Sequence, residues 1–375
     1  MSAPGAGSRP SSAQAAPSLH DRLDAGVMIP AHPLALDEAG RPDLRAQRAL
    51  SRYQLAAGAD GLAVGVHSTQ FELHDDPVML REIWELAADA VREHREVRNI
   101  RSTGRARTPS GPSTILVAGI VGDTRQAVRE AAAASELGYE AALLSPWGMA
   151  KASQEALLER AAAVGEVMPT IGFYLQDSVG GLPLDRSFWG RLFDLDSVVA
   201  VKTAPFDRYR TNDVVQELLF HDRWDQVAVL TGNDDAIVHD LITPYRAVVD
   251  DRVREVRARG GLLGQWAVGA RAAARLVTEA NAAVEADCIP QDLLARAADM
   301  VEINAAVFDV VHDFAGCVPG VNEVLRQQGL VSTARCLGPD VLSPGQADLI
   351  RGVRERFPDL LDEEFVEEGR DGWLS

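Results

Sequence analysis

The sequence predicts an α/β protein, a (β/α)8 TIM barrel with a C-terminal helical extension. Short apolar, β-branched runs bounded by Gly, Pro or Asp recur eight times through the first 270 residues. Segments rich in Ala, Leu, Arg and Glu with helical spacing lie between most of these runs. Between residues 115 and 226 the strand onsets repeat every 26 to 29 residues, which is close to the length of one strand-plus-helix unit.

The predicted strands are continuous apolar runs rather than alternating ones, which indicates burial on both faces, as in a parallel sheet covered by helices. They cover residues 26–30, 61–66, 115–120, 141–146, 170–175, 198–203, 226–232 and 261–266. Helices are predicted between them, as at 124–137 and 153–164. An open doubly wound sheet is the alternative, but no glycine-rich dinucleotide motif follows the first strand.

Three regions are predicted along the chain. The strand pattern assigns residues 23–270 to the barrel, and helical patterns assign 271–375 to a helical region packed on it. Residues 1–22, whose first twenty are rich in Ser, Ala, Pro and Gly, are predicted to be a disordered tail without the apolar core of a secretory signal. The arginine-rich segment 92–107 is predicted to be irregular, either a solvated loop or an anion-binding or subunit-contact loop.

Composition limits the partners of the chain. The formal charge of -18 argues against nucleic acid and anionic membranes as general partners. No apolar run approaches the roughly 18 to 20 residues of a membrane-spanning helix. Cys288, Cys317 and Cys336 show no CxxC spacing, so neither a zinc cluster nor a disulfide framework is indicated, and a reducing cytoplasm is the predicted location.

One lysine stands out by its position. Of the 37 basic residues only Lys151 and Lys202 are lysines, and Lys202 ends the apolar run Val198–Val201. A guanidinium stays charged in a protein, whereas a lysine in an apolar setting can lose its proton and become a nucleophilic amine. Barrel enzymes place their working groups at the carboxyl ends of strands, so Lys202 is a candidate imine-forming residue. A solvated ammonium at a strand end is the structural alternative.

Other candidates follow the neighbouring strands. Tyr174 ends the fifth predicted strand, 28 residues before Lys202, and adjacent strands lie about 4.8 Å apart, so a phenol is predicted beside the amine as a proton shuttle. A buried core tyrosine is the alternative. His67, Ser68 and Thr69 crowd a turn after the second strand, where they would hold a substrate carboxylate or simply form an ST-turn.

Asp234 and Asp235 follow the seventh strand in the sequence "TGNDD". A metal site is one interpretation of these carboxylates, but a solvated turn that caps the next helix is favoured. The histidines form no HxH or HExxH cluster, so a metal-dependent aldolase is the less favoured alternative.

The series "MIPAHPLALDEAGRPDL", "GADGLAVGVHSTQFEL", "PTIGFYL", "VVAVKTA", "TGNDD" and "GGLLGQW" resembles the dihydrodipicolinate synthase and N-acetylneuraminate lyase family in order and spacing, over roughly residues 24 to 350. The resemblance implies a (β/α)8 barrel, usually tetrameric, that forms a Schiff base with pyruvate or another 2-oxo acid. Lys202 would then form the imine, Tyr174 would shuttle protons, and His67 and Ser68 would hold the substrate carboxylate.

The chain also departs from the family pattern. His67 and Ser68 replace paired threonines, and the run that follows Tyr174 lacks the arginine that receives the aldehyde substrate's carboxylate in the synthase. Trp147 follows the fourth strand, where the synthase has a tyrosine for the proton relay. Trp147 and Leu175 indicate a more apolar distal pocket and a substrate less anionic than aspartate semialdehyde.

The sequence therefore predicts a cofactor-free class I lyase that acts on a 2-oxo acid, and the resemblance implies an even-numbered homo-oligomer, a dimer or tetramer. The narrower alternative is dihydrodipicolinate synthase proper, which the missing distal residues disfavour. A barrel that has lost catalysis and only binds a ligand is the alternative from another class, although a binding protein gains little from a buried amine.

Overall fold

The structure is a computed structural model that describes residues 17–102 and 113–375. Eight parallel strands form one sheet in the order β1-β10-β7-β6-β5-β4-β3-β2. The strands are β1 (Met28–Pro30), β2 (Gly61–Val64), β3 (Ile115–Ile120), β4 (Ala141–Leu144), β5 (Thr170–Leu175), β6 (Val198–Ala204), β7 (Ala228–Thr231) and β10 (Ala258–Leu263).

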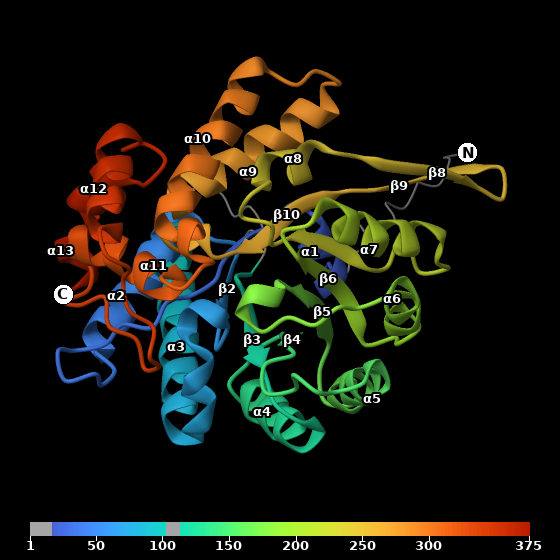
Figure 1. The fold of residues 1–375 in the computed structure, drawn as a ribbon, viewed down its shortest axis with the longest axis horizontal. Coiled ribbons are helices and arrows are strands. Elements are labelled where there is room, and N and C mark those ends of the chain that lie inside the picture. The colour runs from blue at the N-terminus through green and yellow to red at the C-terminus, as the bar shows by residue number, and fades with distance from the viewer. Residues whose placement is uncertain (1–16, 103–112) are drawn as a thin grey trace, which may run out of the picture.

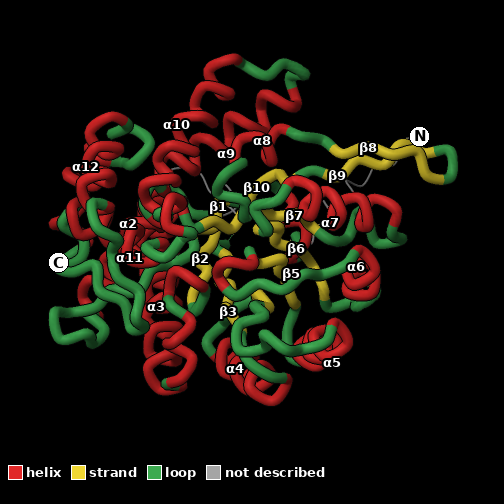
Figure 2. Tube along the Cα trace, in the orientation of Figure 1, coloured by secondary structure: helices red, strands yellow, loops and turns green. Residues whose placement is uncertain are grey.

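The sheet curls until its two edge strands meet. A parallel bridge joins Ala31, just after β1, to Ala63 of β2, and the His32 N–H donates to the Ala63 carbonyl at 2.8 Å. Figures 1 and 2 show the strands at the centre of the molecule with helices around them. The predicted (β/α)8 barrel is confirmed, because each of the eight predicted runs overlaps a strand of this barrel.

Helices connect successive strands and cover the outside of the barrel (Figure 1). They are α2 (Leu44–Ala57), α3 (Pro77–Ser102), α4 (Thr124–Glu136), α5 (Gln154–Gly165), α6 (Arg186–Phe193), α7 (Arg208–Phe220), α8 (Ile237–Ile242) and α9 (Ala270–Glu285). Side-chain caps fix where several of them begin: Asp43, Asp123 and Ser153 each accept a hydrogen bond from a main-chain N–H of the first turn. None of the described helices is both long and apolar enough to cross a membrane.

The structure differs from the predicted bounds of the N-terminal tail and of the irregular segment 92–107. Ser18 caps a short helix α1 (Leu19–Asp24), so residues 19–22 are helical and do not belong to a disordered tail, while residues 1–16 lie outside the described part. The prediction of irregular structure over residues 92–107 is wrong for residues 92–102, which are helical because α3 continues through Ser102. The rest of that segment lies outside the described residues.

The N-terminal end of the barrel is closed by α1. Leu23 of this helix belongs to the apolar cluster of the barrel interior, together with side chains of the barrel strands such as Ile29 and Leu230. α1 packs against β6, β7 and β10. Because this end is filled, the open end of the barrel is the one at the carboxyl ends of the strands.

The helical extension packs on the barrel as predicted, but it begins later. α9 takes the place of the eighth barrel helix, next to α8 and α2, so the barrel runs beyond residue 270. The extension proper comprises α10 (Gln291–Val307), α11 (Cys317–Gln327), α12 (Gln346–Arg356) and α13 (Glu363–Trp373). The end of α10 and the start of α11 reach the carboxyl ends of the strands, while α13 packs on α2 through Tyr53, whose hydroxyl donates to Asp362 at 2.8 Å.

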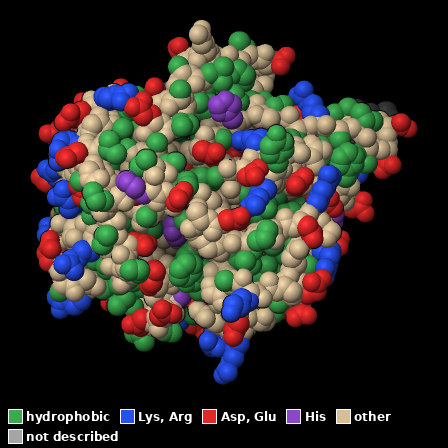
Figure 3. Space-filling model, viewed as in Figure 1, with side chains coloured by type: hydrophobic (Ala, Val, Ile, Leu, Met, Phe, Trp, Pro, Cys, Tyr) green, Lys and Arg blue, Asp and Glu red, His purple; other side chains and the backbone are tan. Residues whose placement is uncertain are grey.

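An antiparallel hairpin, β8 (Tyr245–Val249) and β9 (Arg252–Val256), was not predicted. It extends away from the barrel beside α7 (Figure 1). Its two-residue turn is formed by Asp250 and Asp251, both in left-handed backbone, which suits a tight hairpin. On the face viewed in Figure 3, acidic and basic side chains are interspersed rather than gathered into one patch of either sign.

Candidate active site

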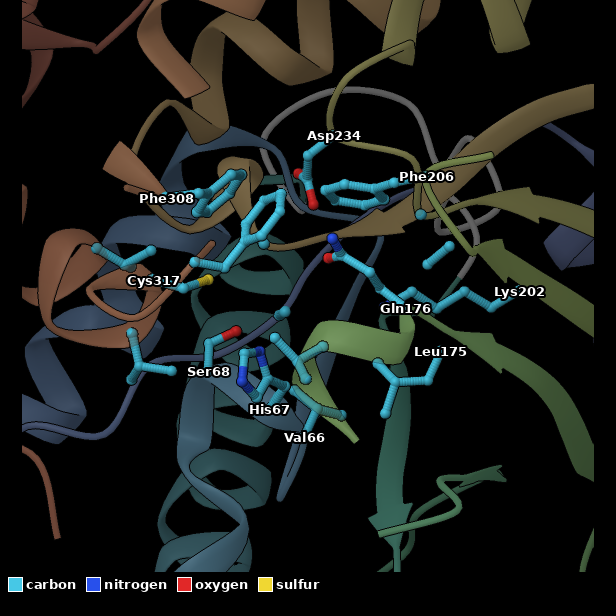
Figure 4. A pocket seen from close by; sticks show the side chains of 18 of the residues that line it. Val66, His67, Ser68, Leu175, Gln176, Lys202, Phe206, Asp234, Phe308 and Cys317 are labelled. Atoms are coloured by element: carbon cyan, nitrogen blue, oxygen red, sulfur yellow. The ribbon is translucent and has the colours of Figure 1, made fainter. Parts of the chain in front are cut away.

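A cavity of about 660 Å³, counting its mouth, lies at the carboxyl ends of the barrel strands. Its floor and walls come from the strand ends and the loops that follow them, and its cover comes from the helical extension through Phe308, Phe314, Cys317, Val318 and Val321. Figure 4 shows Asp234 and Phe206 on one side of this cavity and His67 and Ser68 on the opposite side. The lining is mostly apolar, and no arginine of the described residues belongs to it.

Lys202 enters the cavity from β6. Its side chain is only 7% exposed, and Nζ lies 4.4 Å from the centre of the Phe173 ring on the neighbouring strand. Within the described residues, Nζ forms no hydrogen bond or ion pair. The sequence-based prediction of a buried lysine at this strand end therefore agrees with the geometry of the cavity, and the solvated alternative does not.

Gly232 makes room for this lysine. A Cβ at position 232 would lie 2.4 Å from Cε of Lys202 and 2.8 Å from Cβ of Ala204. No real Cβ packs so closely, so the absent side chain at Gly232 leaves the space through which the lysine extends.

Asp234 also lines the cavity, and in water at neutral pH an aspartate side chain carries a negative charge. It is 8% exposed, and its Oδ1 accepts the N–H of Gln265 at 3.0 Å. The favoured interpretation of "TGNDD" as a solvated helix-capping turn is wrong for this residue, because α8 is capped by Ala236 without a side-chain bond and Asp234 points into the barrel mouth. Asp235, by contrast, is exposed.

Burial shifts both groups toward their neutral forms. Loss of water lowers the pKa of the Lys202 ammonium, and the nearby charge of Asp234 opposes this shift. Loss of water raises the pKa of the Asp234 carboxyl, which the Gln265 N–H and Lys202 oppose. An uncharged amine and a protonated carboxyl therefore become accessible together near neutral pH, a combination suited to carbonyl chemistry.

Tyr174 does not reach the cavity, and its predicted role as the proton shuttle is wrong. In the pairing of β5 with β6, Phe173 lies opposite Lys202, and Tyr174 lies opposite Thr203. Because successive side chains of a strand point to opposite faces, Tyr174 points outward, where its ring packs on Trp189 and its hydroxyl donates to the Leu184 carbonyl at 3.3 Å. Phe173, without a hydroxyl, occupies the inward position.

The turn after β2 carries the three predicted binding residues, of which two line the cavity and one does not. His67 and Ser68 line the cavity, and neither side chain forms a hydrogen bond within the described residues. Burial and the charge of Lys202 lower the pKa of His67 to about 4, which favours a neutral ring. Thr69 was expected to bind substrate but does not line the cavity. Its Oγ1 accepts the Gly65 N–H at 3.0 Å and donates to the His32 carbonyl at 2.6 Å, so it holds the turn.

Trp147 lies at the mouth rather than beside the lysine. It stacks on Phe71 with ring centres 5.1 Å apart and remains 37% exposed. It lines an outer cavity of about 880 Å³ that shares His67, Phe314 and Cys317 with the inner one. The role of Trp147 in substrate binding stays a prediction, since Trp147 lines the outer cavity and does not line the inner one.

Two polar residues of the cavity are not predicted from the sequence. Gln176 follows β5 and lines the cavity, and Asp234 was assigned to solvent. Both follow strands that neighbour β6, which is the signal that places them near Lys202. Within residues 17–102 and 113–375, no three His, Cys, Asp or Glu side chains are grouped so as to hold a metal ion.

The fold and the site define a class of protein, a (β/α)8 barrel with a helical extension over a buried lysine on the sixth strand. No family model matches the chain, and no curated protein matches it. Similar structures have nonetheless been solved. Dihydrodipicolinate synthase from Aquifex aeolicus superposes with a TM-score of 0.65 at 18% identity, over 90% of this chain and 99% of that one.

Two further structures show the same likeness. N-acetylneuraminate lyase from Fusobacterium nucleatum superposes with a TM-score of 0.65 at 15% identity, covering 88% of this chain and 98% of that one. YagE, a prophage protein of the dihydrodipicolinic acid synthase family from E. coli K12, superposes with a TM-score of 0.67 at 15% identity, covering 88% and 98%. The resemblance to this family that the sequence predicted is thus confirmed at the level of the fold.

Proposed function

We propose that this chain is a class I lyase that forms an imine between Lys202 and the carbonyl carbon of a 2-oxo acid. The observation that carries the proposal is the position of Lys202, one of only two lysines, in an apolar cavity at the carboxyl ends of the strands. Its lowered pKa increases the share of uncharged amine at neutral pH, and only that form attacks a carbonyl. No cofactor is needed for this chemistry.

The imine would serve as an electron sink. Once protonated, it stabilises a negative charge on the adjacent carbon as an enamine, which lowers the barrier for making or breaking a carbon–carbon or carbon–oxygen bond there. Ser68 and His67 line the same cavity as Lys202, their side chains form no hydrogen bond within the described residues, and they are the proposed contacts of the substrate carboxylate. Pyruvate is present in solved structures of two proteins with this fold, YagE and the lyase from Fusobacterium nucleatum.

The far end of the substrate is proposed to be apolar. Phe206, Phe314 and Leu175 line the cavity, and among the described residues its lining holds no cation other than Lys202. A second carboxylate there would lose its hydration without gaining a partner. This composition disfavours the narrower alternative, dihydrodipicolinate synthase proper, whose aldehyde substrate carries a carboxylate.

Borohydride reduction tests the proposal. Incubation with pyruvate and sodium borohydride should add one reduced pyruvate to Lys202, seen as a mass increase on the peptide that contains it. The chain offers a matched control because its only other lysine, Lys151, is exposed. Lys151→Arg should keep the adduct, and Lys202→Arg should abolish it. An unaltered protein without an adduct would favour the second candidate, a barrel that only binds its ligand.

Two assays separate the narrower possibilities. A coupled assay with pyruvate and aspartate semialdehyde tests the synthase, and a negative result with an intact adduct leaves the broader lyase. Insensitivity of adduct formation to a chelator is expected, whereas loss of activity on chelation would favour a metal-dependent aldolase. Light scattering would measure the proposed dimer or tetramer.

A further inference from the structure

Imine formation needs a proton-transfer group, and the aromatic residue opposite Lys202 cannot supply one. The carbonyl oxygen must be protonated before it leaves, and a carbon-bound proton must then be removed to give the enamine. Phe173 occupies the place on β5 that faces Lys202, and the hydroxyl of Tyr174 lies on the outer face. Besides Lys202, the titratable side chains that line the cavity within the described part of the chain are Asp234, His67 and Cys317.

Asp234 has the position that this task requires. It follows β7, which pairs directly with β6, where Leu230 lies opposite Lys202. Its carboxylate is fixed by the Gln265 N–H, and its main-chain carbonyl accepts the Asn304 amide at 2.6 Å. Within the described residues no ion pair or hydrogen bond joins Asp234 to Lys202, and both side chains line the same cavity. Asp234 lies across the cavity from His67 and Ser68 (Figure 4).

We propose that Asp234 is the proton-transfer group that acts with Lys202. The inference rests on the proposed function, because it concerns the same imine. It assigns to a carboxyl group just after the seventh barrel strand the task that the sequence predicts for a phenol on the fifth.

The Asp234 carboxyl alone can give and accept the protons of each step. The Lys202 amine attacks the carbonyl carbon, and a proton passes from nitrogen to oxygen through the Asp234 carboxyl, which gives a neutral carbinolamine. Asp234 then donates its proton to the hydroxyl, the carbon–oxygen bond breaks, and water leaves behind a protonated imine and a carboxylate. That carboxylate next removes a proton from the adjacent carbon, which yields the enamine and restores the carboxyl.

The other titratable groups are less suited to donate this proton. Burial and Lys202 lower the pKa of His67 to about 4, so its ring is a neutral, weak base near pH 7. Burial and the surrounding carboxylates raise the pKa of the Cys317 thiol, so it is a weak acid. Burial raises the pKa of Asp234, which brings it toward neutral pH, where a proton donor and acceptor is most effective.

Exchange of the methyl protons of pyruvate in D2O, followed by NMR, measures enamine formation directly. Asp234→Asn keeps the side-chain oxygen that accepts from Gln265 but cannot carry the proton. Exchange should slow by about 100-fold or more, as expected for loss of a general acid–base. Asp235→Asn is the matched control, since the neighbouring side chain is exposed and outside the cavity, and it should exchange like the unaltered protein.

Asp234→Asn also removes a negative charge near Lys202, and this change favours the uncharged amine. Removing the Asp234 carboxylate takes away the charge that raises the pKa of Lys202, so the amine of the variant should be more fully deprotonated. Slower exchange in Asp234→Asn would therefore not reflect a protonated lysine. Asp234→Glu restores a carboxyl and should recover part of the exchange.

The possible outcomes are distinct. Exchange in Asp234→Asn as fast as in the unaltered protein, with the adduct at Lys202 intact, would overturn the role of Asp234 and leave the proposed function standing. Equal losses in Asp234→Asn and Asp234→Glu would also overturn it, because then the carboxyl is not what matters. Absence of any adduct at Lys202 in the unaltered protein would refute the proposed function itself, and this inference with it.

Discussion

Gly232 determines whether Lys202 can extend into the cavity. Its backbone lies outside the left-handed region, so alanine is permitted there by conformation, yet the new Cβ would lie 2.4 Å from Cε of Lys202. Gly232→Ala should therefore displace the lysine and slow borohydride trapping of pyruvate by about 100-fold, the cost of a misplacement of about 1 Å. Overpacking should also lower the free energy of unfolding by about 1 to 3 kcal/mol.

A matched glycine separates local from general effects of this substitution. Gly352 in α12 has open space where its Cβ would stand, and Gly352→Ala should trap pyruvate at the unaltered rate. If Gly232→Ala trapped pyruvate as fast as the unaltered protein, Lys202 would have to reach the pyruvate carbonyl without the space at Gly232.

Tyr174 offers a second test at the scale of single residues. Because its hydroxyl faces α6 and donates to the Leu184 carbonyl, Tyr174→Phe should leave the rate of pyruvate trapping unchanged. Loss of that hydrogen bond should lower the free energy of unfolding by about 0.5 to 1.5 kcal/mol, measured by chemical denaturation. If Tyr174→Phe no longer formed the adduct with pyruvate, the phenol would have to take part in the reaction at the carbonyl carbon.

The outward direction of Tyr174 also explains why the sequence predicted only part of the site. Thr170 pairs with Val198 at a separation of 28 residues, which would set Tyr174 opposite Lys202. An irregularity after Thr170 changes the separation to 29, so Phe173 takes that place, and a shift of one residue moves a side chain to the other face of a strand. Such an irregularity leaves no mark in the apolar pattern, whereas the choice of lysine among arginines was visible.

At the scale of elements, two loops meet over the cavity in strained backbone. Phe206 after β6 and Phe314 before α11 have φ of 52° and 66°, a region that bulky residues rarely adopt. Their rings contact each other edge to face, with centres 5.7 Å apart, and both line the cavity. Strain of this kind persists where the surroundings enforce it and is concentrated at binding sites, so the pair is a candidate determinant of specificity.

Phe314→Ala should change which 2-oxo acids form the adduct. Phenylpyruvate would lose a ring contact, and the concentration needed for half-maximal trapping should rise about twofold to tenfold, the equivalent of one aromatic pair. Pyruvate, which carries no ring to stack there, should be trapped as before. Phe220→Ala is the control, since Phe220 is 54% exposed at the end of α7. An equal effect on both acids would indicate a general loss of structure rather than a lost contact.

Elements with strong local signals were predicted, and those that depend on their surroundings were not. The eight barrel strands are continuous apolar runs because they are buried on both faces, so each was found within a few residues. The hairpin of β8 and β9 lies between two barrel elements, and its exposed valines, Val248 and Val253, belong to no core pattern. The position of Asp234 required knowledge of which strand end lies next to β6, which a run of polar turn residues does not reveal.

At the scale of the whole molecule, buried neutral histidines couple folding to pH. His32 is fully buried, where its ring contacts Ser51 and Gln47, and burial lowers its pKa from 6.5 to about 4. The unfolded chain therefore binds a proton between pH 6.5 and 4 that the folded chain does not, so stability falls as the pH falls through that window. His67, with a pKa of about 4, acts in the same direction.

Chemical denaturation at pH 7 and pH 4.5 should measure this coupling. His32 alone should account for a loss of about 2 to 3 kcal/mol in the free energy of unfolding between the two values, because each unit of pKa shift is worth about 1.4 kcal/mol. His32→Gln should lose the contacts of the ring and be less stable at pH 7, but its stability should fall less on acidification. The exposed His239 is the control, and His239→Gln should keep the full fall. A fall in His32→Gln as large as in the unaltered protein would mean that the acid sensitivity arises from other groups, such as the carboxylates that form ion pairs across the surface.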